Sequence, residues 1–119
     1  MTTFEKTIGN AEHKFGYLNL TSDNGTTYGQ NFPMPLTKLI VVTESRQYLA
    51  TMNNNPNQIW GGLRRWFKDE NIYPGDKVRI TYDPAKENID GRSPVEISLL
   101  QRAEITEANP NILIEDEQE

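Results

Sequence analysis

A run of amide side chains followed by basic side chains occupies residues 53–68 of this 119-residue chain. Asparagine and glutamine can bond bidentately to adenine edges, whereas arginine and lysine bind guanine edges or phosphate oxygens. We therefore predict that this segment contacts double-stranded DNA, with the amides at bases and the cations at phosphates. An ordinary polar surface loop is the alternative. The predicted DNA-binding residues here are Asn53, Asn54, Asn55, Asn57, Gln58, Trp60, Arg64, Arg65 and Lys68.

A second polar segment, residues 13–31, is rich in hydrogen-bonding side chains and carries almost no charge. We predict that Lys14 binds a phosphate and that Tyr17 and Asn19 also contact DNA. An ordinary strand followed by a turn is the alternative for this segment. The two segments together predict a sequence-selective binding domain for double-stranded DNA.

No set of residues in this sequence predicts catalysis. The only histidine, His13, is expected at the surface, and its neighbour Glu12 would point to the opposite side of a strand. The absence of cysteine excludes thiol nucleophiles, disulfides and zinc–thiolate sites. Gly61-Gly62 is only a dipeptide and not a phosphate-binding loop. We therefore expect a protein that is not an enzyme and that uses no cofactor or metal.

Charge is distributed unevenly along the chain, whose net charge is −5. Residues 1–102 carry 12 basic and 11 acidic side chains, whereas six acids and no base follow Ala103. The body is therefore nearly neutral, and the excess negative charge lies near the C-terminus. We expect a single β-barrel domain over residues 1–103 and an acidic, flexible tail over residues 104–119.

The acidic tail, residues 104–119, is most simply a solubilising segment. Its last part also contains three aliphatic residues, Ile112, Leu113 and Ile114, immediately before a run of acids. Such a segment can add a strand to a partner protein's sheet, so residues 111–119 are a candidate protein contact. The same segment could instead fold back over basic surface of its own domain.

The sequence predicts no association with a membrane. No apolar stretch approaches the length of a transmembrane helix, about 20 residues. The first ten residues have neither the basic nor the apolar region of a secretory signal. We therefore expect a cytoplasmic protein.

Short apolar runs separated by turn residues predict a chain dominated by strands. Residues 39–43 are apolar or β-branched throughout, which predicts a strand buried on both faces. Val78, Ile80 and Tyr82 alternate with polar residues and predict a strand with one buried face. The other expected strands cover residues 4–8, 13–20, 46–52 and 95–102.

One helix is predicted in the middle of the chain. Ile59, Leu63, Trp66 and Phe67 fall at i, i+4, i+7 and i+8, so they share one helix face, which we expect in the core. Pro74-Gly75 then predicts a tight turn into the next strand. The elements together predict a mostly β fold with one or two short helices, arranged as a small open β-barrel.

Two sequence motifs resemble a known family. GLRRW at residues 62–66 is followed, after eight residues, by GDKVRI at residues 75–80. These motifs resemble the DNA-binding pseudobarrel domain of plant auxin-response and abscisic-acid-response transcription factors, and are similar to target-recognition domains of some bacterial restriction endonucleases. That family shows Gly-Trp-x-x-Phe on a short helix, then a Gly-Asp turn into a strand. Here Leu63 stands at the usual Trp and Trp66 at the usual Phe.

The resemblance covers residues 16–99 and implies a seven-stranded open barrel, the pseudobarrel. It further implies that two arms grip the major groove of DNA. By position, the first arm would lie within residues 13–30 and the second within residues 53–60. These are the two polar segments described above.

Two other functions fit the same sequence. A protein-interaction or regulatory module would use the acidic tail as its contact. A binder of single-stranded nucleic acid on a small barrel would need exposed aromatic side chains for base stacking. The candidates for that stacking are Tyr17, Tyr28 and Trp60.

Overall fold

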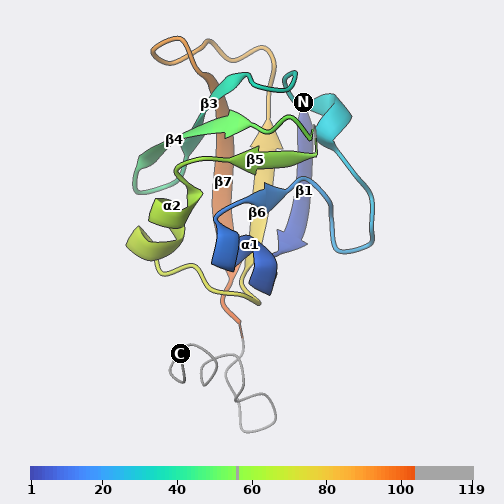
Figure 1. The fold of residues 1–119 in the computed structure, drawn as a ribbon, viewed down its shortest axis with the longest axis vertical. Helices are drawn as coiled ribbons and strands as arrows, with labels where there is room; N and C mark the ends of the chain where they lie inside the picture. The colour runs from blue at the N-terminus through green and yellow to red at the C-terminus, as the bar shows by residue number, and fades with distance from the viewer. Residues whose placement is uncertain (56, 104–119) are drawn as a thin grey trace, which may run out of the picture.

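Seven strands pair edge to edge in one curled, open sheet that forms a half-barrel (Figure 1). The computed structural model describes residues 1–55 and 57–103, so the expected acidic tail lies outside the described residues. The strands are β1 (Thr2–Thr7), β2 (Leu18–Asn19), β3 (Lys38–Val42), β4 (Gln47–Met52), β5 (Gln58–Trp60), β6 (Lys77–Tyr82) and β7 (Ser93–Gln101). The helices are α1 (Asn10–Phe15), α2 (Leu63–Asp69) and a 3-10 turn, Gly29–Asn31.

The strand order across the sheet is β1-β6-β7-β3-β4-β5-β2. All neighbouring strands are antiparallel except β3 and β7, which are parallel. Both helices lie near the end of the half-barrel where β7 ends (Figure 1). The predicted mostly β fold, with two short helices on a small open barrel, is confirmed. No helix in the described part of the chain is long and apolar enough to cross a membrane.

The core lies inside the curl of the sheet and is closed at one end by α2. Leu63, Trp66 and Phe67 of α2 are all buried, as the sequence predicts for this helix face. Large aromatic side chains bury roughly 150–250 Å² each, so this short helix contributes a large share of the apolar contact. Leu39 and Val41 of β3 are fully buried, and Ile40 between them is also buried, which confirms a strand buried on both faces.

The prediction that Ile59 belongs to the central helix is wrong. Ile59 is buried as expected, but it lies on β5, where it pairs with Leu18 of β2 and Met52 of β4. Gly61 separates this strand from α2 with a φ of +94°, which a helix cannot include. Two strand partners thus outweigh the helical spacing of the apolar residues.

The predicted strand over residues 13–20 is also wrong, because its first part belongs to α1. The Glu12 carboxylate accepts a hydrogen bond from the Gly9 N–H at 2.9 Å and so satisfies a free donor at the helix start. Gly16 ends the helix with a φ of +77°. Glu12 is therefore buried in a helix and not part of a strand. His13, expected at the surface, is half-buried and lies against the rings of Phe67 and Tyr73.

Candidate nucleic-acid interface

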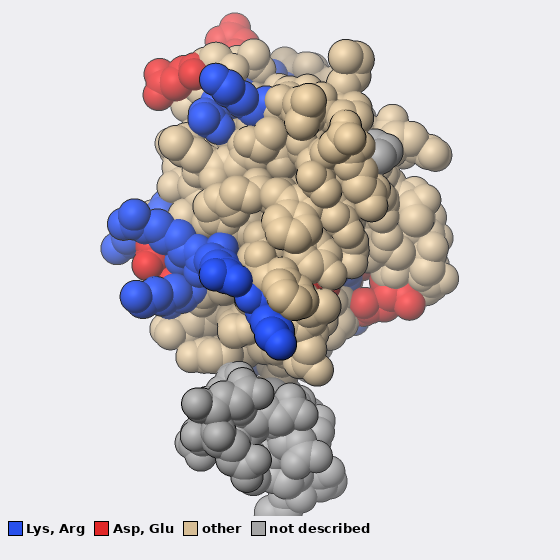
Figure 2. Space-filling model, viewed as in Figure 1, with Lys and Arg blue, Asp and Glu red and all other residues tan. Residues whose placement is uncertain are grey.

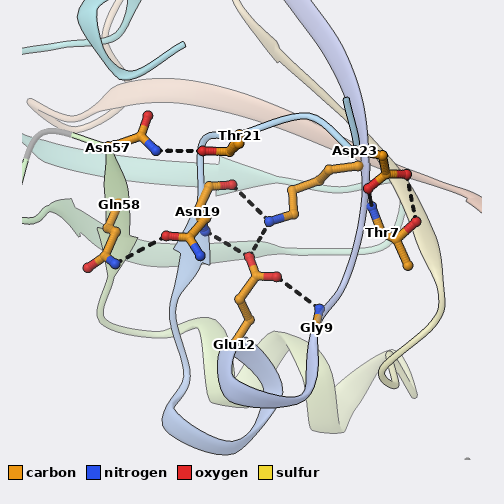
Figure 3. Close-up of polar contacts among 9 residues, drawn as sticks. Thr7, Gly9, Glu12, Asn19, Thr21, Asp23, Asn57 and Gln58 are labelled. Atoms are coloured by element: carbon orange, nitrogen blue, oxygen red, sulfur yellow. Dashed lines mark hydrogen bonds and ion pairs between the residues drawn. The ribbon is translucent and has the colours of Figure 1, made fainter. Parts of the chain in front are cut away.

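Two polar loops lie side by side at one end of β5. The first loop comprises residues 20–31 and the second loop residues 53–57. The Asn57 side chain joins them. Its Nδ2 donates to Thr21 Oγ1 at 2.6 Å (Figure 3), and its Oδ1 accepts from the Gly29 N–H at 3.1 Å. A hollow of about 350 Å³ lies between the loops, lined by Thr27, Gly29, Gln30 and Asn57.

Three of the amides predicted to contact DNA are joined to one another by hydrogen bonds through Gln58. Gln58 Nε2 donates to Asn19 Oδ1 at 3.1 Å, and Gln58 Oε1 accepts from Asn53 Nδ2 at 3.1 Å and from Trp60 Nε1 at 2.9 Å. The Trp60 ring in turn stacks on Tyr17, with centroids 4.7 Å apart. Five predicted contact residues thus form one half-buried layer across β2, β5 and the second loop, which leaves each with reduced capacity for an external partner.

Asn54 and Asn55 differ from these amides because both side chains are exposed. Asn55 Oδ1 accepts a hydrogen bond from the Asn57 N–H at 3.1 Å, which is a local turn contact within the second loop. The tip of the second loop is therefore where amide groups face solvent.

A buried ion pair beneath this layer holds β2 in place (Figure 3). Lys6 Nζ contacts the Glu12 carboxylate and donates to the Asn19 carbonyl at 3.0 Å. Glu12 Oε2 also accepts from the Asn19 N–H at 2.7 Å. Lys6 and Glu12 are 4% and 5% exposed, so Asn19 is fixed by charged groups that water scarcely reaches. Sequence reasoning missed this pair, although a glutamate three residues after Gly9 is a helix-start signal.

The first loop is also tied to the opposite edge of the sheet. Asp23 accepts hydrogen bonds from the Thr7 N–H at 2.8 Å and from the Thr7 hydroxyl at 2.7 Å (Figure 3). Burial alone would raise the pKa of Asp23. The two Thr7 hydrogen bonds and the positive charges of Lys77 and Lys6 outweigh burial and hold that pKa below its usual value.

The predicted phosphate-binding residues form a second group, the basic cluster of Lys14, Arg64, Arg65 and Lys68. Figure 2 shows Lys and Arg side chains gathered over α2 and extending toward α1. The Arg64 guanidinium crosses to α1 and donates to the Lys14 carbonyl at 2.9 Å. Gly16 makes this crossing possible, since a Cβ there would lie 2.5 Å from Arg64 Cγ.

One acidic side chain lies within reach of the basic cluster. Asp69 Oδ2 is 3.5 Å from Arg65 Nε and 3.2 Å from an Arg46 guanidinium nitrogen. Both arginine side chains are largely exposed, so these ion pairs hold them only weakly. The cluster therefore keeps cationic groups exposed at the surface.

The amides and the cations occupy opposite ends of β5. The second loop leads into the first residue of β5, whereas α2 and its cations follow the last residue (Figure 1). The surface between them shows no charged side chains in the view of Figure 2. The structure thus brings the two polar loops together but separates them from the basic cluster by a neutral strip.

Groups for metal or stacking chemistry are few among the described residues. No set of three or more His, Asp or Glu side chains in that part of the chain is placed to hold a metal ion. Of the aromatic candidates for base stacking, Tyr28 already packs against the core, since the centroid of its ring lies 4.3 Å from that of the Phe4 ring. Tyr17 and Trp60 are half-buried and stack on each other.

Comparison with known proteins identifies a neighbour in fold. No family model matches the chain, and no curated protein matches its sequence. The solved structure of the hypothetical Arabidopsis thaliana protein At1g16640.1 superposes with a TM-score of 0.61 over 85% of this chain and 91% of that chain. The two sequences are 15% identical, so the likeness concerns the half-barrel fold alone.

Proposed function

We propose that this protein binds double-stranded DNA selectively, without catalysing a reaction on it. The observation that carries the proposal is the joining of two amide-bearing loops by Asn57 at one end of β5, with the basic cluster at the other end. A duplex bound along β5 would then meet base-reading groups and phosphate-binding groups at different points of its length.

The proposal divides the predicted contact residues by role. Asn54 and Asn55 are exposed at the tip of the second loop, so they read base edges. Asn19, Asn53, Asn57 and Gln58, which bond within the protein, hold the loops in position. The cations that bind phosphates are Lys14, Arg64, Arg65 and Lys68.

The net charge of −5 does not oppose this proposal. The acids in excess all follow Ala103, and the first 102 residues carry 12 basic and 11 acidic side chains. Phosphate binding depends on the local charge at the contact surface, and it releases counterions from DNA. Binding should therefore weaken steeply as salt is raised.

A titration of labelled duplexes at two salt concentrations tests the proposal. Lys68→Ala should weaken binding to all sequences alike and lower the slope of log K against log salt by about one. The matched control is Arg79→Ala, since Arg79 is also an exposed cation but pairs with Glu5 on the β1–β6 edge, outside the basic cluster. Absence of binding to any duplex pool at low salt, or equal effects of both variants, would contradict the proposal.

Binding of single-stranded nucleic acid is the second candidate. It is favoured by the Tyr17–Trp60 stack, which is partly exposed on the neutral strip and could continue onto a base. Single strands added as competitors in the same titration separate the two candidates. Displacement of the duplex by an equal concentration of single strand would favour this second function.

A further inference from the structure

A pocket between the two helices combines an aromatic lining with cations. This α1–α2 pocket has a volume of about 440 Å³. The His13 ring lies 5.4 Å from the Phe67 ring and 5.7 Å from the Tyr73 ring, which makes one side aromatic. No acid lines it. The lining residues are His13, Arg64, Phe67, Lys68, Asn71 and Tyr73.

The chain leaves the described fold beside this pocket. Arg102 contacts the Asn71 carbonyl through Nη1 and donates to the Glu70 carbonyl through Nη2 at 3.2 Å. The Ala103 N–H then donates to Asp76 Oδ1 at 2.7 Å. Because Asn71 also lines the α1–α2 pocket, the Arg102 side chain, two residues before the acidic tail, reaches the pocket edge.

The composition of the acidic tail complements the α1–α2 pocket. Ile112, Leu113 and Ile114 are followed directly by three acids, and no base occurs after Ala103. Aliphatic side chains suit the aromatic side of the pocket, and carboxylates suit Arg64 and Lys68.

The acidic tail is also long enough for its aliphatic residues to reach the α1–α2 pocket. The nine residues that end at Ile112 span up to about 30 Å when extended. A segment tethered at this distance binds its own domain at an effective concentration in the millimolar range, so even a weak contact can be populated.

A second pocket near the chain exit suits the acidic tail less well. It has a volume of about 470 Å³ and includes Arg46 and Arg102 in its lining. Glu44, Asp69 and Glu70 line it as well, so acids outnumber cations there and would repel a carboxylate-rich segment.

We propose that residues 112–117 of the acidic tail dock in the α1–α2 pocket of their own chain. The aliphatic residues contact Phe67 and Tyr73, and the acids that follow pair with Arg64 and Lys68. The docked tail covers half of the basic cluster, so it would compete with phosphates. That competition rests on the proposed function, whereas the docking does not.

Amide NMR spectra of the full chain, recorded without DNA, test the docking. Two variants remove the contact: Ile112→Ser/Leu113→Ser/Ile114→Ser and Glu115→Gln/Asp116→Asn/Glu117→Gln. Both should shift the signals of the pocket residues His13, Arg64, Phe67, Lys68 and Tyr73 relative to the unaltered chain. The matched control, Glu104→Gln/Glu107→Gln/Glu119→Gln, neutralises the same number of acids and should leave these signals in place.

A substitution of a residue that lines the α1–α2 pocket provides a second test of the docking. Lys68→Gln should reproduce the shifts at His13 and Tyr73, whereas Lys86→Gln, on the distant pair with Glu96, should not. The docking is overturned if neither tail variant moves the pocket signals, or if the signals that move belong to Thr43 and Arg46 in the second pocket. Shifts that depend on protein concentration would also overturn it, because the occupant would then be the tail of a second copy.

Discussion

Lys6 and Glu12 bury opposite charges under β2, and each depends on the other. We expect Glu12→Gln to destabilise the protein by about 3–5 kcal/mol, because it leaves the Lys6 ammonium buried without a counter-charge. The double variant Lys6→Met/Glu12→Gln should destabilise less than Glu12→Gln alone. Denaturant unfolding followed by tryptophan fluorescence measures both.

The exposed pair between Glu5 and Arg79 is the control for this prediction. Their side chains are 45% and 48% exposed, so Glu5→Gln should cost less than about 1 kcal/mol. Equal losses from Glu5→Gln and Glu12→Gln would show that burial of the Lys6–Glu12 pair has no special effect on stability.

Tyr48 gives a prediction for alkaline pH. Burial, a 2.8 Å hydrogen bond to Glu70 and the negative charges of Glu70 and Asp69 raise the pKa of Tyr48 from 10.0 to about 12. The folded state therefore holds this proton more tightly than the unfolded state, and the free energy of unfolding should fall as pH rises from 10 to 12. Tyr48→Phe should make that fall shallower and remove the highest transition in a tyrosinate absorbance titration. A titration without a transition near pH 12 would contradict this assignment.

The hydrogen-bond partners of individual amide side chains at the candidate site could not be predicted from the sequence. Asn57 and Gln58 are recognisable as polar from residue type alone. Whether their amides face solvent or bond to Thr21 and Asn19 depends on contacts 36 and 39 residues away along the chain. No local pattern encodes such distant partners, so the sequence predicts that the candidate site is polar but not which of its amides are free.

At the scale of elements, strands inside the sheet are predictable and the short elements are not. Residues 39–43 are apolar or β-branched throughout, and residues 77–82 alternate between polar and apolar side chains. Both segments form strands near the expected bounds. α1 and β5 are six and three residues long, too short for a periodicity to be distinctive. Their conformations are decided by tertiary partners, namely Lys6 for α1 and the two neighbouring strands for β5.

The contact between the two loops gives a prediction at this scale. Asn57→Ala removes the hydrogen bonds to Thr21 and Gly29, so it should destabilise the protein by about 1–3 kcal/mol. Amide hydrogen exchange at Gly29 should accelerate. Asn54→Ala, at the exposed loop tip, is the control and should change neither quantity. Unchanged exchange at Gly29 in Asn57→Ala would mean that the loops are held together by other contacts.

At the scale of the whole molecule, docking of the acidic tail should reduce DNA affinity. If the tail is docked about two-thirds of the time, the apparent dissociation constant for DNA is about threefold higher than that of the open protein. Glu115→Gln/Asp116→Asn/Glu117→Gln should therefore bind duplex DNA about threefold more tightly.

The control for this prediction is the charge-matched variant Glu104→Gln/Glu107→Gln/Glu119→Gln, measured at the same salt concentration. Equal gains in both variants would indicate a general effect of net charge rather than relief of docking. Failure of either variant to bind DNA would contradict the proposed function and leave the NMR test of docking unaffected.

The position of β7 in the sheet has a consequence for how the chain reaches its native state. β7 is the last strand among the described residues, yet it lies between β6 and β3 and joins the β1–β6 pair to the β3–β4–β5–β2 group in the sheet. During synthesis the two groups can form separately, but they cannot combine until residue 101 has been added. The parallel pairing of β3 with β7 spans more than 50 residues, and such distant pairings slow folding. The nascent protein should therefore expose its apolar interior until β7 has been synthesised, which makes this period the time of greatest risk for aggregation.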